Sequence, residues 1–264
     1  MRLILAVAAL LFMATASHAR DADDVVQHTT APSQLAPDKA YLLFDSSRAQ
    51  SGMMKIAHVF MRMPTQAELD AYLAAKSAAY AKALPQLTRK AKGGPVPSLE
   101  EYPFSWGGAE NTFAVDMGKT LGASDTFLIE VPPGTYVLYG VSVGSRGLTT
   151  CNCLGTVKFE AVPGRITQMG SLFADKVHEV SPVPHLEDNL GEQMAQYAFV
   201  LGQALVPADA TTAMPPQLSA LPHGLAEYRA VGMFREPGAA SINRLAPIPG
   251  VLEYDRGRVI LAQP

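Results

Sequence analysis

The sequence predicts a mainly β protein: an antiparallel β-sandwich with one inserted amphipathic helix and an irregular, proline-rich C-terminal arm that ends in a hairpin. Three observations predict this class. Short apolar runs with strand-like alternation recur along the chain, glycine and proline separate them, and only one segment has a helical period. The 264 residues suffice for one large β domain or two small ones.

The first nineteen residues have the pattern of a secretory signal peptide. Arg2 precedes the uncharged apolar run 3–14, and Ser17-His18-Ala19 offers small residues where a signal peptidase cleaves. That run is about a dozen residues, whereas a membrane-spanning helix needs roughly 20. We therefore expect an exported protein, periplasmic or secreted, with no transmembrane span once residues 1–19 are removed. A retained membrane anchor is the alternative.

A change in polarity and in the spacing of apolar residues separates a leader from the predicted core. Residues 20–38 are polar and aperiodic, which predicts a flexible leader. The predicted sandwich core covers 39–175 and begins with strand-like runs at 40–44 and 53–63. In the second run, one face is formed by Ile56, His58, Phe60 and Arg62.

One helix is predicted within an insertion over 65–92. Thr65-Gln66-Ala67-Glu68 matches a capping box, and leucines and tyrosines follow one stripe over about 66–84. Pro85 either ends or kinks this helix. A single helix in a β-rich chain usually covers a sheet edge or an open end of a sandwich, so we expect it to do so here.

The central block and the C-terminal region are predicted from their turns. Runs at 155–162 and 166–173 are expected to form a hairpin around a Pro-Gly-Arg turn. Region 176–264 is predicted to be a proline-rich arm packed on the core, and its apolar run 195–206 fits a strand or a short helix. Two short apolar runs around Asp255-Arg256-Gly257 predict the terminal hairpin.

The segment Pro132-Pro133-Gly134-Thr135-Tyr136-Val137-Leu138 resembles the start of a strand in secreted transthyretin-like and carboxypeptidase-regulatory-like β-sandwiches. Together with 151–156 and 159–172, it is similar to an uncharacterised family of exported β-sandwich proteins from alphaproteobacteria. The resemblance covers residues 125–173. It implies a fold and a compartment but brings no activity and no catalytic residue, and the helical insertion departs from the compact sandwich pattern.

The charge balance excludes one class of partner. A net charge of −3 leaves no electrostatic footprint for nucleic acid and no strong attraction to anionic lipid. One basic stretch stands out, and a solvated helix face is its ordinary explanation. Its residues are Lys76, Lys82, Arg89, Lys90 and Lys92.

Cys151 and Cys153 are the only cysteines, and in an oxidising compartment they are predicted to form one local disulfide. Because residues i and i+2 of a flat strand lie near the upper limit of bridging distance, the bridge needs a local turn or holds strain. Strain would permit a thiol–disulfide role. Copper(I) is a further alternative, with candidate donors Cys151, Cys153, Met53, Met54, Met61 and Met63; core packing is the other explanation for Met61 and Met63.

Two further motifs are candidates for function. Gly140-Val141-Ser142-Val143-Gly144 matches the nucleophile elbow of hydrolases, although it continues an alternating strand where that chemistry needs a strand-to-helix turn. Tyr102, Phe104 and Trp106 form a candidate contact patch for a sugar or a partner protein. An edge strand pinned by aromatic packing is the alternative explanation for these three side chains.

The sequence thus assigns no catalytic, cofactor-binding or metal-binding residue. The expected function is an exported, non-catalytic binding or structural module of the bacterial cell envelope, whose partner is an envelope protein or a glycan. The alternative is a periplasmic enzyme: a hydrolase that uses Ser142, or a thiol–disulfide or copper protein that uses Cys151 and Cys153. Convergence of Ser142, Cys151 and a histidine in one cleft would favour the enzyme.

Overall fold

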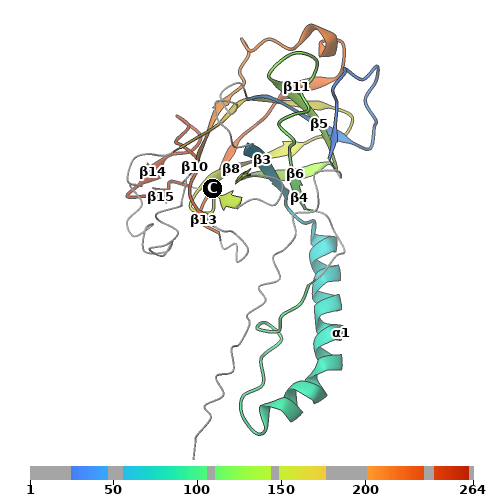
Figure 1. Ribbon diagram of the computed structural model, residues 1–264, viewed down its shortest axis with the longest axis vertical. Helices are drawn as coiled ribbons and strands as arrows, with labels where there is room; N and C mark the ends of the chain where they lie inside the picture. The colour runs from blue at the N-terminus through green and yellow to red at the C-terminus, as the bar shows by residue number, and fades with distance from the viewer. Residues whose placement is uncertain are drawn as a thin grey trace, which may run out of the picture.

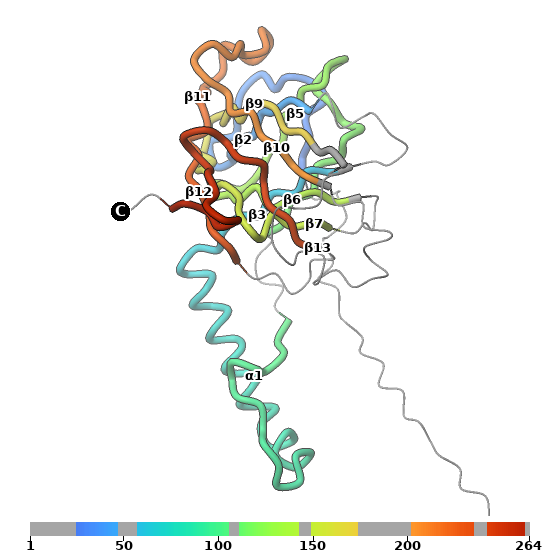
Figure 2. Tube along the Cα trace, turned by 90° about the vertical axis from the view of Figure 1, so that its left-hand side faces the viewer, coloured from blue at the N-terminus to red at the C-terminus, as the bar shows by residue number. Residues whose placement is uncertain are grey.

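The computed structural model describes residues 25–46, 56–105, 111–143, 149–176, 201–234 and 241–261. These residues form two β-sheets that pack face to face, and one α-helix that projects from them (Figures 1 and 2). The prediction of a mainly β protein with one helix is confirmed.

The first sheet has six strands in the order β1-β5-β2-β9-β10, with β11 also paired to β9. Their bounds are Val26–Gln27 (β1), Ala40–Asp45 (β2), Thr126–Val131 (β5), Ile166–Lys176 (β9), Leu201–Pro207 (β10) and His223–Leu225 (β11). Most pairs are antiparallel, but β9 runs parallel to both β2 and β11.

The second sheet has seven strands in the order β12-β8-β6-β3-β4, with β7 paired to β6 and β13 paired to β7. Their bounds are Ile56–Arg62 (β3), Thr112–Ala114 (β4), Gly134–Val143 (β6), Thr149–Cys151 (β7), Thr156–Ala161 (β8), Arg229–Val231 (β12) and Ser241–Ile242 (β13). Only the β7–β13 pair is parallel among the described strands of this sheet.

The main core lies between the two sheets and is rich in aromatic rings. Phe44 of β2 stacks on Phe127 of β5 with ring centroids 5.2 Å apart and also packs against Phe60 of β3. A second apolar cluster on the outer face of the first sheet includes Tyr41 and Leu43. Because this sheet is covered on both faces, its strand 40–44 reads as a continuous apolar run.

The predicted hairpin of 155–162 with 166–173 is wrong. The two runs form β8 and β9, which belong to different sheets, so the Pro-Gly-Arg turn carries the chain across the sandwich. The Pro-Pro-Gly turn before β6 does the same for β5 and β6. Turn residues specify that the chain reverses, but burial of each strand's apolar face against the opposite sheet decides where the strand goes.

Both ends of the described chain contribute strands to the two sheets, and β10 (Leu201–Pro207) takes the strand alternative that was left open for run 195–206. In the predicted leader 20–38, β1 pairs with β5, and Asp116 N donates to the Gln27 side-chain oxygen at 2.6 Å. Beyond residue 200, β10 and β11 join the first sheet, while β12 and β13 join the second. The predicted signal peptide, residues 1–19, lies outside the described residues.

The terminal hairpin is confirmed. Strands β14 (Tyr254–Asp255) and β15 (Arg258–Val259) pair antiparallel. Arg256 and Gly257 between them have φ of 47° and 79°. Positive φ at both central residues belongs to the two-residue turn whose twist matches that of the strands.

Helix α1 runs from Gln66 to Ala91 and begins with the predicted capping box of Thr65 and Glu68. It continues through Pro85 beyond the predicted end near residue 84, and Figure 1 shows its last turns bending away from the first ones. The expectation that it covers a sheet edge or a sandwich end is wrong, because none of its residues is buried.

Candidate functional site

Two of the three aromatic residues of the candidate contact patch pack on helix α1. The Tyr102 ring meets Tyr80 edge-on with centroids 5.4 Å apart, and the Phe104 ring lies 5.8 Å from that of Tyr72. Trp106 lies outside the described residues. The described part of this patch is therefore neither an edge strand nor a free-standing group, but the lining of a segment that returns along the helix.

Backbone carbonyls strengthen this contact. Tyr80 donates its hydroxyl to Pro97 O at 2.9 Å, and Lys76 donates to Glu100 O at 3.0 Å. We call α1 and the return segment 92–105 together the arm; from here on, this name does not refer to the predicted C-terminal region 176–264. Both views show the arm extending away from the sandwich (Figures 1 and 2).

The arm leaves apolar surface in solvent. Leu69, Leu73 and Leu84 are 40%, 57% and 37% exposed. They belong to the stripe that carries Tyr80, and the return segment covers this stripe only in part. In most proteins the apolar face of a helix packs against the core, and this packing supplies most of the helix's stability. The apolar stripe of α1 packs against no sheet, which is unusual.

An ion pair between a sheet residue and a helix residue fixes the base of the arm to the sandwich. Arg62 at the end of β3 donates through both terminal nitrogens to the Glu68 carboxylate, at 3.1 Å and 2.5 Å. Glu68 also accepts from the Thr65 backbone N–H at 2.7 Å. The Arg62 guanidinium and then this N–H hold the pKa of Glu68 at about 2. The carboxylate therefore stays ionised and fixes the first turn of α1 to the sheet.

A buried polar chain crosses the sandwich, and the sequence analysis missed it. His58 Nε2 lies 2.8 Å from Ser46 Oγ, and its Nδ1 lies 2.7 Å from Gln203 Nε2. Asn152 Nδ2 then donates to Gln203 Oε1 at 2.7 Å. All four side chains are at most 1% exposed. The one available signal was a histidine at an inward position of a strand.

The hydrogen bonds between these four side chains run in one donor-to-acceptor direction, and a backbone carbonyl fixes it. Asn152 Nδ2 also donates to the Leu138 carbonyl at 3.2 Å, so its amide cannot be turned around without bringing two oxygens together. Gln203 must then accept from Asn152 and donate to His58 Nδ1. His58 consequently carries its proton on Nε2 and donates it to Ser46 Oγ.

This direction is the reverse of a serine nucleophile's activation. A base must accept the hydroxyl proton, whereas His58 offers a proton to Ser46. Burial also lowers the pKa of His58 to about 3, so the ring is neutral near pH 7. In this arrangement the four side chains satisfy one another's hydrogen-bonding groups, and burial closes them off from a substrate in solution.

Ser142 does not sit on a nucleophile elbow. It lies within β6, paired with Ala57 of β3 and Thr149 of β7. Gly140 of the motif has its own explanation, because a Cβ there would overlap the Thr150 carbonyl of β7. His58 pairs with the neighbouring Val141, so His58 and Ser142 project from opposite faces of the sheet. The two side chains do not converge.

The structure brings Cys151 and Cys153 together. Their Cα atoms are 5.1 Å apart, because the chain turns immediately after β7 ends at Cys151. The two side chains are 0% and 2% exposed and lie in an apolar cluster with Val59 and Tyr139. Asn152 between them points to the other side of the sheet, into the polar chain.

Metal-ligand residues do not gather within the part of the chain that the structure describes: no three His, Cys, Asp or Glu side chains there could hold an ion together. Of the thioether donors considered for copper, Met53 and Met54 lie outside the described residues. Met61 packs beside the Cys151 cluster, and Met63 is 42% exposed.

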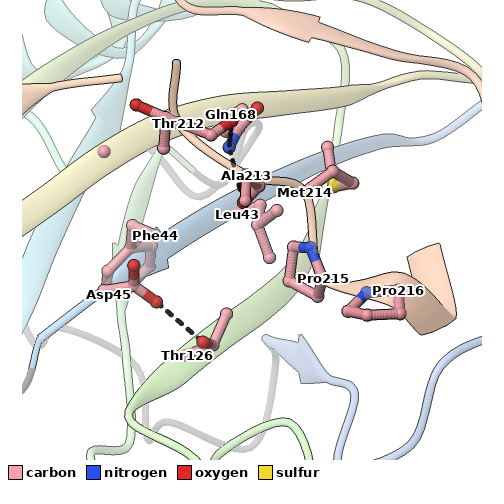
Figure 3. A pocket seen from close by; sticks show the side chains of 11 residues that line it. Leu43, Phe44, Asp45, Thr126, Gln168, Thr212, Ala213, Met214, Pro215 and Pro216 are labelled. Atoms are coloured by element: carbon pink, nitrogen blue, oxygen red, sulfur yellow. Dashed lines mark hydrogen bonds between the residues drawn. The ribbon is translucent and has the colours of Figure 1, made fainter. Parts of the chain in front are cut away.

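A small pocket lies on the outer face of the first sheet, between β2, β9 and the segment 212–216 (Figure 3). Its volume is about 190 Å³, whereas ligand sites usually enclose roughly 300–1,000 Å³. Its polar groups already have partners, since Thr126 donates to Asp45 at 2.7 Å and Gln168 donates to the Thr212 carbonyl at 3.4 Å. It therefore offers little to a ligand.

Among the described residues, no helix combines the length and the apolar character needed to cross a membrane. Comparisons of the whole chain with protein families, with curated proteins and with solved structures yield no match.

Proposed function

We propose that the protein is an exported, non-catalytic binding or structural module of the bacterial cell envelope, located in the periplasm or secreted, and that the arm is its contact element. The proposal of export is supported by the signal-like residues 1–19 and by the proximity of Cys151 and Cys153, which we infer to be a disulfide. The proposed partner is an envelope component.

The observation that carries the proposal is a 26-residue helix that buries none of its residues. None of its residues belongs to the apolar core clusters that the structure describes in the sandwich. The capping box, the abundant alanines and the return segment keep it helical instead. A structured element that presents leucines to solvent is typical of an interaction site.

The polar chemistry of the sandwich supports the non-catalytic part of the proposal. The Ser46–His58 hydrogen bond is buried, and His58 is its donor, whereas the base that activates a serine must accept the proton. Ser142 lies in a regular ladder of paired strands. The two cysteines are shielded from a redox partner in solution, whereas redox-active thiols are usually accessible.

The test is site-specific crosslinking in living cells of the native host. A photoreactive residue replaces Leu73 on the arm, and the matched control replaces Leu225 on β11, which is 44% exposed. Leu73 should yield crosslinks to an envelope component and Leu225 should not, while cell fractionation should place the protein outside the cytoplasm. Equal labelling from both positions, or an uncut protein in the cytoplasm, contradicts the proposal.

A further inference from the structure

The outer half of the arm carries charge of one sign. Between Asp70 and Glu100 the sequence has no acidic residue and five basic ones: Lys76, Lys82, Arg89, Lys90 and Lys92. The whole chain carries −3, so these five positive charges leave −8 on the other residues. Four of the acidic residues, Glu68, Asp70, Glu100 and Glu101, belong to the arm itself, so the positive charge is concentrated in its outer part, 71–99.

The positive charges gather on one face of the helix. Lys82, Arg89 and Lys90 are spaced i, i+7 and i+8, which places them on the same side. Leu84 lies on the opposite side, because each residue turns the helix by about 100°. That opposite side holds Tyr80 and the return segment. Lys82, Arg89 and Lys90, together with Lys92 just beyond the helix, are exposed.

The negative charges on the rest of the chain do not cancel the positive potential of this helix face. A helix of 26 residues is about 39 Å long, and it points away from the sandwich (Figure 2). The Debye length at physiological ionic strength is about 8 Å. A partner that meets the end of the arm is thus screened from most charges on the sandwich, so the net charge of −3 does not decide which partner binds there.

We propose that this basic face docks on the anionic phosphate headgroups of a membrane surface. The proposal rests on the function proposed above and names the partner of the arm. The charges stand on a convex helix face over about two to three turns, which suits a flat surface with many phosphates better than one small anion.

The test is co-sedimentation of the protein, purified in its native processed form, with vesicles of phosphatidylcholine with or without phosphatidylglycerol. The protein should bind only the anionic vesicles, and added salt should weaken the binding. Each basic side chain near an anionic surface contributes roughly fivefold, so K82Q/R89Q/K90Q/K92Q should lower the partition coefficient by at least about 100-fold. These are exposed positions, and circular dichroism should stay unchanged.

The matched control is K119Q/R229Q/R256Q/R258Q, which removes the same charge from exposed positions of the sandwich and the terminal hairpin. It should bind as the unmodified protein does or only slightly more weakly, because these four side chains lie away from the docking face. The inference is overturned if the control loses as much binding, if neutral vesicles bind equally, or if soluble polyphosphate is bound while vesicles are not. If Leu73 still crosslinks to an envelope protein in those cases, the proposed function survives and only its lipid partner is rejected.

Discussion

The sandwich and the arm use apolar side chains in opposite ways. In the sandwich, Phe44 and Phe60 are at most 1% exposed and meet other rings from both sheets. In the arm, Leu73 is 57% exposed and no residue of α1 is buried. The difference assigns stability to the sandwich, while the arm leaves apolar surface exposed, which under the function proposed above is the surface that meets a partner. Four experiments test this contrast, in order of decreasing expected effect.

The largest expected effect is in the core. Phe44→Ala should lower the free energy of unfolding by about 3–5 kcal/mol, because it removes buried area and leaves a cavity. The matched change in the arm, Leu73→Ala, should cost less than about 0.5 kcal/mol. Urea denaturation of both variants measures the difference. Comparable losses would mean that the arm belongs to the cooperative core.

The next effect depends on pH. His58 has a pKa of about 3 when folded and 6.5 when unfolded. The unfolded state therefore takes up a proton first as pH falls. Stability is fully present above pH 6.5 and declines by about 1.4 kcal/mol per pH unit toward pH 3. Urea denaturation from pH 7 to pH 4 should show a steeper decline for the unmodified protein than for His58→Gln. Equal slopes would mean that His58 titrates normally in the folded state.

The cysteine pair should contribute a smaller amount. Replacing Cys151 and Cys153 together by Ser should lower stability by about 1–3 kcal/mol, since the bridge closes a very short loop. The change should also loosen Asn152, the residue between them, and with it the hydrogen bond to Gln203. Mass spectrometry without reductant gives the oxidation state directly. Two free thiols in the protein isolated from its native host would refute the inferred disulfide.

The smallest effect on global stability should come from the helix cap. Thr65→Ala removes one side of the capping box and should cost the helix about 1 kcal/mol. Hydrogen exchange in 66–91 should then become about fivefold faster, while the denaturation midpoint of the sandwich stays unchanged. Thr88→Ala is the control, because alanine is the better helix former inside a helix. A shifted midpoint would show that the arm and the sandwich unfold together.

Features that depend on neighbouring residues were predicted well. The capping box at Thr65, the shared face of His58 and Phe60 on β3 and the terminal hairpin follow from spacing within a few residues. The packing of Tyr102 and Phe104 on the helix was not predicted. Nothing in their local spacing reveals that a segment some 25 residues away is their partner.

By itself, the sequence determined the β-rich class, the single helix, the tight turns and the charge of the arm, because each depends on residue type and short-range spacing. Only the tertiary structure decided that the turn at Pro163-Gly164-Arg165 crosses between sheets, that β9 runs parallel to β2, and that α1 leaves the sandwich. These outcomes come from competition among distant apolar faces for burial. The polar chain through His58 likewise exists only where strands far apart in sequence meet.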